Sequence, residues 1–179
     1  AAIDAYPDAE VIACKTFDEC FVKAEHDEKI KIIIPESNRI TGNIGIEYLI
    51  FKHRLNIYAE HFHKIEHNLL ASPGTKLKDI KNVYSHAQAL SQCSKFIKKN
   101  NINENVRADT AGSAQLVSKS KIKNDAAIAS KLSAEIYKLD VVASNIENEK
   151  GNVTRFLIMG KTVSQPELEK GKFITSFLF

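Results

Sequence analysis

The 179-residue chain has no tryptophan, one methionine and only three cysteines. Cys14, Cys20 and Cys93 are odd in number and lack Cys-x-x-Cys spacing, which argues against a disulfide framework and against a cysteine-rich zinc site. Reduced thiols in a cytoplasmic protein are the simplest interpretation. No apolar run approaches membrane-spanning length, and the first residues do not resemble a signal peptide. We therefore predict a cytoplasmic protein that does not enter a membrane.

The sequence also lacks a strong charge of either sign, because 25 basic and 22 acidic residues give a net charge of +3. A nucleic-acid-binding protein would carry a concentrated basic face, so we expect no nucleic-acid partner. The phosphate-binding motifs GxxxxGK[ST] and GxGxxG are absent, as is the nucleophile motif GxSxG. We therefore expect no cofactor.

Short apolar runs alternate with helical segments along the chain. The clearest buried strand is the run at residues 30–34, which we expect to stop at Pro35. Strands are predicted at 11–13, 30–34, much of 55–70, 82–84, 106–108, 126–129, 141–142 and 155–159. Helices are predicted at 17–26, after Gly42, and at 85–98, 110–119 and 130–138. This alternation is typical of an α/β protein with mostly parallel sheets.

The predicted strand-to-helix junctions carry small polar residues. Ser85 and Gln88 have the spacing of a capping box, Thr110 and Ser130 open the next two helices, and Asn38 precedes a glycine turn. Each could be only a cap that stabilises its helix by about 1 kcal/mol. Together they would place several helix N-termini around one crevice, which suits a small carboxylate ligand.

Histidines offer a second kind of site. His61, His63 and His67 would share one face of an extended strand and could hold a metal with a neighbouring glutamate. Ligands normally come from more than one element, and core-edge or exposed histidines are commoner, so we expect no metal. His86 is the histidine best placed for a pocket, and Cys93 is interpreted as a packed thiol.

Several longer motifs occur in order along the chain. They are Ile34-Pro35 with Asn38 and Gly42, Ile65 to Leu70, Pro73-Gly74, Asp79 to Cys93, Asp109 to Ala114, Ala126 to Ser130, Asn145-Ile146 and Asn152 to Phe156. A Thr-Arg-Phe triplet alone would be weak evidence. The ordered set, from Ile32 to Gly160, resembles the prephenate dehydratases.

The resemblance implies two lobes like those of type II periplasmic binding proteins, with prephenate in a cleft between them. Lobe 1 would comprise residues 1–63 with a return strand at 151–163, and lobe 2 would comprise residues 64–150. Residues 164–179 would form a linker and the first strand of an ACT regulatory domain. Phenylalanine would be an effector only where that domain is complete. A homodimer or homotetramer is also implied.

In the reaction that the resemblance implies, prephenate loses its ring hydroxyl as water and its ring carboxylate as carbon dioxide. The product is phenylpyruvate, on the route to phenylalanine. By resemblance Thr154 is the catalytic residue, which assists departure of the hydroxyl. Threonine is a poor acid at neutral pH, so a strong hydrogen bond is as plausible as proton transfer. The expected substrate-binding residues are Asn38, Ser85, His86, Gln88, Thr110, Ser130, Asn152 and Arg155.

Alternatives stay open for one residue and for the function. Arg155 could bind a substrate carboxylate bidentately, or it could point away from Thr154 and form a structural ion pair, because strand neighbours face opposite ways. An arogenate dehydratase is one alternative, and its substrate carries an amine where prephenate carries a keto group. A non-catalytic small-anion binding protein of the same fold is the other alternative.

The chain departs from the resemblance in three places. It begins apparently inside the family's first helix, so we expect a preceding strand and a glycine–serine loop to be missing. Arg39 stands where a serine is expected, and it could bind a carboxylate or occlude the site. Residues 172–179 look like an isolated first ACT strand, so we expect no working phenylalanine sensor in this chain.

Overall fold

The computed structural model describes residues 1–120 and 122–162 and confirms an α/β protein. The chain divides into two compact units, one formed by residues 1–64 with the strand that begins at Val153, the other by residues 65–152. The first unit is therefore discontinuous in sequence. None of the described helices has both the length and the apolar character needed to cross a bilayer.

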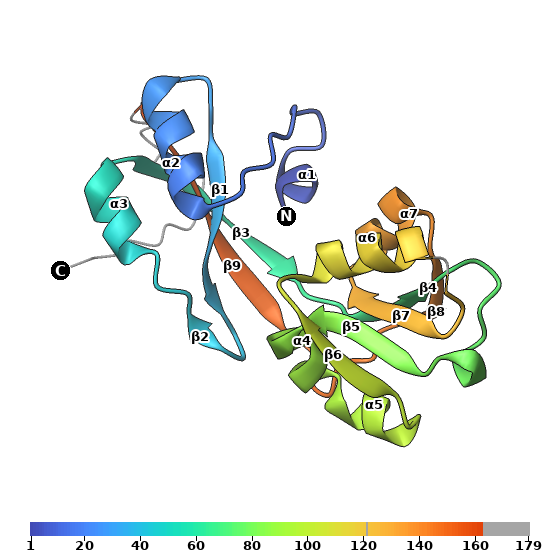
Figure 1. Ribbon diagram of the computed structural model, residues 1–179. Helices are drawn as coiled ribbons and strands as arrows, with labels where there is room; N and C mark the ends of the chain where they lie inside the picture. Colours follow the sequence, from blue (N-terminus) through green and yellow to red (C-terminus); the bar gives the residue numbers. More distant parts are fainter. Residues whose placement is uncertain (121, 163–179) are drawn as a thin grey trace. The chain divides into compact units, whose positions relative to one another are not determined.

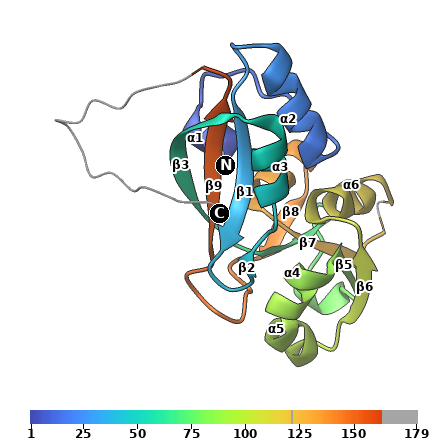
Figure 2. The ribbon, with the colours of Figure 1, turned by 90° about the vertical axis from the view of Figure 1, so that its left-hand side faces the viewer.

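The first unit is a four-stranded sheet in the order β2-β1-β9-β3, with every neighbouring pair antiparallel. Phe21 and Leu49 pack from α2 and α3 against Ile34 and Met159 on one face of this sheet. The helix α1 lies on the other side (Figures 1 and 2). The elements of this unit are α1 (Ala2–Ala5), α2 (Phe17–His26), β1 (Ile32–Asn38), β2 (Gly42–Asn43), α3 (Glu47–His53), β3 (Asn56–Lys64) and β9 (Val153–Gly160).

The second unit is a five-stranded sheet in the order β6-β5-β7-β4-β8. The helices α4 and α5 pack on one face and α6 and α7 on the other, so that β7 in the middle is buried along its whole length (Figure 1). The elements are β4 (Asn68–Ala71), the 3₁₀ helix η1 (Leu77–Asp79), β5 (Asn82–His86), α4 (Ala87–Gln92), α5 (Ser94–Lys99), β6 (Asn103–Arg107), α6 (Thr110–Ser120), β7 (Asp125–Ala129), α7 (Lys131–Tyr137) and β8 (Asp140–Ala143).

The expectation of mostly parallel sheets is wrong for the first unit and holds only in part for the second. β1 and β3 run in the same direction, but β9 lies between them and runs the opposite way because it returns from the second unit. In the second unit β5 is parallel to β6 and β7, whereas β4 is antiparallel to β7 and β8. Alternation of strands and helices does not show where a returning strand enters a sheet.

The sequence predicted that β1 would end at Pro35, and this prediction is wrong. The strand continues to Asn38, and its register against β9 shifts between Pro35 and Ser37. Proline lacks a backbone N–H and is tolerated in strands at bulges, where the regular ladder is already interrupted. The shift brings Asn38 directly opposite Thr154.

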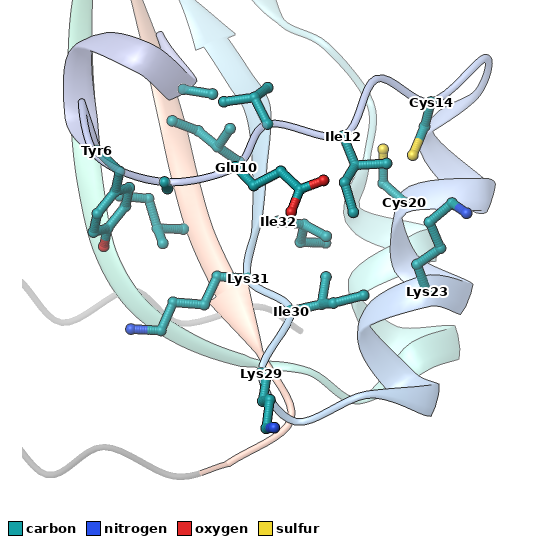
Figure 3. A pocket seen from close by; sticks show the side chains of 15 residues that line it. Tyr6, Glu10, Ile12, Cys14, Cys20, Lys23, Lys29, Ile30, Lys31 and Ile32 are labelled. Atoms are coloured by element: carbon teal, nitrogen blue, oxygen red, sulfur yellow. The ribbon is translucent and has the colours of Figure 1, made fainter.

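The strand predicted at residues 11–13 is not formed. A cavity of about 440 Å³ lies between this segment and the edge of β1, lined by Ile12 and Cys14 on one side and by Ile30 and Ile32 on the other (Figure 3). Among the described residues, β1 has no strand beside that edge from Ile32 to Ile34. The cavity separates the segment from this open edge, so no hydrogen-bonded ladder forms, the segment stays irregular and Ile12 is half exposed.

Two predicted elements are each divided in the structure, and the helix predicted in the first unit is confirmed. The helix expected at 85–98 is divided into α4 and α5 at Cys93, whose backbone leaves the helical region. The long extended segment is divided into β3 and β4, which belong to different units. The helix predicted at Phe17–His26 is confirmed, with Thr16 capping it by accepting a bond from the backbone N–H of Glu19.

Candidate active site

Thr154 lies near the start of β9 and is buried, with 7% of its surface exposed. Its partner across the sheet, Asn38, donates a hydrogen bond from Nδ2 to the Thr154 Oγ1 at 2.9 Å. The Asn38 Oδ1 accepts from the backbone N–H groups of Ile40 and Thr41 at 2.9 and 3.1 Å. Those two donors fix which end of the amide faces Thr154.

This arrangement sets the direction in which the threonine hydroxyl can donate. The Thr154 Oγ1 is already an acceptor for Asn38, so its own proton is available for a second partner. A buried hydroxyl held in this way is a positioned hydrogen-bond donor. The side chain of Asn38 therefore orients Thr154 and also closes the turn that precedes β2.

Arg155 lies on the opposite face of β9 from Thr154, because successive strand residues alternate. Its Nε donates to Glu60 at 2.6 Å and its Nη1 to Glu36 at 3.3 Å, and the three side chains are each about one quarter exposed. Of the two interpretations that the sequence left open, this geometry supports the structural ion pair. The substrate contact of Arg155 stays a prediction that this geometry does not support.

In the second unit, the predicted junctions do gather at one edge. β5, β6 and β7 run in the same direction, so the three strand ends that lead into α4, α6 and α7 lie at the same side of the sheet (Figure 1). His86, Gln88 and Ser130 are exposed there, and Thr110 is half buried. The sequence prediction that polar junctions converge is therefore met within this unit.

Ser85 does not have the predicted capping role. Its side chain is fully buried and donates to the carbonyl of Ile128 at 2.7 Å, which ties β5 to β7. The cap of α4 is His86, whose Nδ1 accepts from the backbone N–H of Gln88 at 3.3 Å. The structure therefore favours His86 over Ser85 as a ligand-facing residue.

The start of α6 is capped by Asp109, and Thr110 is its first helical residue. The Asp109 Oδ1 accepts from the backbone N–H of Gly112 at 2.5 Å. A Cβ at position 112 would lie 2.7 Å from this carboxylate, so a larger residue there would push the Asp109 side chain out of its capping position. A negative cap opposes a second anion at this helix end. Ser130 caps α7 as predicted, its Oγ accepting from the N–H of Ser133 at 3.2 Å.

Asn152 belongs to a buried polar cluster that the sequence did not reveal. Its Nδ2 donates to the Gln92 Oε1 at 3.3 Å, and the His67 Nε2 bonds the same oxygen at 2.7 Å. Because that oxygen is an acceptor, His67 carries its proton on Nε2 in this arrangement. The side chain of Asn152 thus forms a hydrogen bond within the protein, and its predicted contact with the substrate stays a prediction. The signal that could have revealed Gln92 is its spacing of four residues from Gln88, on one face of α4.

Cys93 is fully buried, and burial raises the pKa of its thiol to about 12. The thiolate is the reactive form of cysteine, and at pH 8 only roughly one Cys93 side chain in ten thousand would be ionised. We expect iodoacetamide to label Cys93 only after unfolding in urea, as read by mass spectrometry of the peptides. Cys14, which is partly exposed, is the internal control. Equal labelling of Cys93 and Cys14 in the folded protein would contradict this account.

The two discontinuous units and the likeness to solved prephenate dehydratases define an α/β protein with a fold like that of type II periplasmic binding proteins. The sequence profile described as prephenate dehydratase matches residues 1–164, so the chain belongs to the prephenate dehydratase family. Arogenate dehydratase 2 of Petunia hybrida is 38% identical over 180 residues, which cover 100% of this chain and 45% of that protein. The chain spans less than half the length of the first curated relatives it matches.

Two solved structures are similar to this one. A structure described as GqqA, a novel type of quorum quenching acylase, has a TM-score of 0.84 and 30% identity, covering 92% of this chain and 60% of that one. The prephenate dehydratase of Arthrobacter aurescens in complex with L-Phe has a TM-score of 0.80 and 26% identity, covering 90% of this chain and 55% of that one.

Proposed function

We propose that this chain carries the catalytic machinery of a prephenate dehydratase, which converts prephenate to phenylpyruvate. The observation that carries the proposal is the hydrogen bond from Asn38 to Thr154 on neighbouring strands. It gives a buried hydroxyl a fixed direction, as a residue that assists a leaving group requires. Membership of the family supports the reaction.

The proposed chemistry is an elimination. The bond between the ring and its carboxylate breaks, and its electron pair enters the ring as carbon dioxide leaves. The bond from the ring to the hydroxyl oxygen breaks at the other side with its electron pair, and the departing hydroxide takes one proton from solvent to become water. The hydroxyl of Thr154 donates a hydrogen bond to this oxygen as negative charge develops on it, which stabilises the transition state.

The substrate is a dianion, and we propose that the polar edge of the second unit binds it. His86 and Gln88 are exposed at the start of α4, and Ser130 is exposed at the start of α7. These side chains offer hydrogen-bond donors for carboxylate and keto oxygens. Thr110 has a weaker claim, because the carboxylate of Asp109 lies at the same helix start.

The test measures the conversion of prephenate and of arogenate by the purified protein under identical conditions. We expect phenylpyruvate to form, with a higher kcat/KM for prephenate than for phenylalanine formation from arogenate. Preference for arogenate would identify the alternative substrate. Binding of prephenate without any turnover would support the non-catalytic alternative and would overturn the proposal.

Three other predictions from the sequence stay proposals. The cytoplasmic location is supported by the free cysteines, although relatives from plants are chloroplastic. The effect of phenylalanine depends on an ACT domain, and the strand predicted at residues 172–179 lies outside the described residues. The proposed homodimer or homotetramer would be measured by light scattering.

A further inference from the structure

Three potential metal ligands meet on the face of the first sheet that carries α1. His61 and His63 are two residues apart on β3 and therefore point to the same side. Asp4 comes from α1, and its Oδ2 lies 3.0 Å from the His61 Nε2 and 3.2 Å from the His63 Nδ1. The three ligand atoms all lie within 4.8 Å of one another.

We propose that Asp4, His61 and His63 bind a divalent transition-metal ion, with Zn²⁺ the preferred one. Imidazole nitrogen and carboxylate oxygen are its usual ligands, and a tetrahedral Zn²⁺ holds its donor atoms about 3.3 Å apart. The two measured separations from Asp4 are close to that value. Three protein ligands leave a fourth position for water or a small anion.

The sequence analysis argued against a metal because ligands normally come from more than one element, and this arrangement meets that condition. The ligands come from two elements, because Asp4 takes the place that the sequence gave to a third histidine. His67 is instead bonded to Gln92.

The site also has a defined support. β3 pairs along its length with the central strand β9, which fixes the spacing of the two histidines. The ring of His63 packs edge-on against Phe156, with 6.4 Å between ring centroids. His63 is also the cross-strand partner of Thr154, so the metal would lie on the same face of the sheet as the catalytic candidate. A bound ion would join α1 to the sheet.

The experiment uses Zn²⁺ in calorimetric titrations and Co²⁺ as a spectroscopic probe. We expect one Zn²⁺ per chain, visible d–d absorption of Co²⁺ typical of a tetrahedral site, and a higher melting temperature with Zn²⁺. Asp4→Asn, His61→Ala and His63→Ala should each weaken Zn²⁺ binding at least tenfold. Asp4→Asn is the sharpest of these, because the amide can still accept a hydrogen bond from a histidine but is a poor metal ligand.

The matched control is His26→Ala, which removes an exposed imidazole from the end of α2. It should leave the affinity for Zn²⁺ unchanged. Far-ultraviolet circular dichroism would verify that each variant is folded. If the wild type binds Zn²⁺ no more tightly than the His61→Ala and His63→Ala variants do, the three side chains only dock α1 on the sheet, and the proposed site does not exist.

Discussion

Replacing Thr154 by valine is expected to lower kcat by about 10²-fold or more, the usual size of a lost proton-donor contribution. Valine has nearly the shape of threonine but has no hydroxyl, so the leaving oxygen would lose its hydrogen bond. The KM should change by only a few fold, because the hydroxyl acts on charge that develops in the transition state. Steady-state formation of phenylpyruvate measures both constants.

The control for this prediction is Thr154→Ser, which keeps the hydroxyl that accepts from Asn38. It should retain much more activity than the valine variant. Valine also removes the Oγ1 that accepts from the Asn38 Nδ2, so thermal unfolding of both variants must be compared with the wild type. Near-normal turnover in a folded valine variant would remove Thr154 from the mechanism.

Replacing Arg155 by methionine is expected to destabilise the first unit by about 1–3 kcal/mol. Methionine keeps the apolar stem but leaves the carboxylates of Glu36 and Glu60 close together without the guanidinium between them. The value lies below that of a fully buried pair, because water screens side chains that are one quarter exposed. Urea unfolding measures the loss.

Activity separates this structural role from a substrate contact. The folded Arg155→Met variant should keep its KM for prephenate within a few fold of the wild type. The triple variant in which Glu36 and Glu60 also become glutamine should recover part of the lost stability, because no uncompensated carboxylate remains. A KM raised tenfold or more with unchanged stability would show that Arg155 binds the substrate after all.

Local patterns predicted much of this molecule correctly. The helix at Phe17–His26 and the strand around residues 126–129 follow from periodicity and from apolar runs of the right length. The position of the junctions that open α4, α6 and α7 at one edge of the sheet followed from the rule that parallel strands share a carboxyl edge, although Asn38 lies in the other unit. Periodicity and apolar runs depend on residues that are near one another in sequence, whereas the shared edge was an inference about how separate strands would pair.

Predictions that required knowledge of distant partners were less accurate. Pro35 was expected to end a strand, but pairing with β9 carries β1 past it through a bulge. Ser85 has the sequence spacing of a helix cap, yet its hydroxyl donates a hydrogen bond to a backbone carbonyl of β7. The segment at residues 11–13 has a strand-like sequence, but a cavity separates it from the open edge of β1 and the two do not pair.

The sequence by itself determined the α/β class and the family, because these depend on ordered motifs and local periodicity. The resemblance to that family then made Thr154 the catalytic candidate. Only the tertiary structure decided how Thr154 is held and where Arg155 points. The tertiary structure also showed that the third side chain beside His61 and His63 is that of Asp4 and not that of His67. Asn38 and Thr154 are 116 positions apart, and only the return of β9 beside β1 brings the amide within hydrogen-bond distance of the hydroxyl.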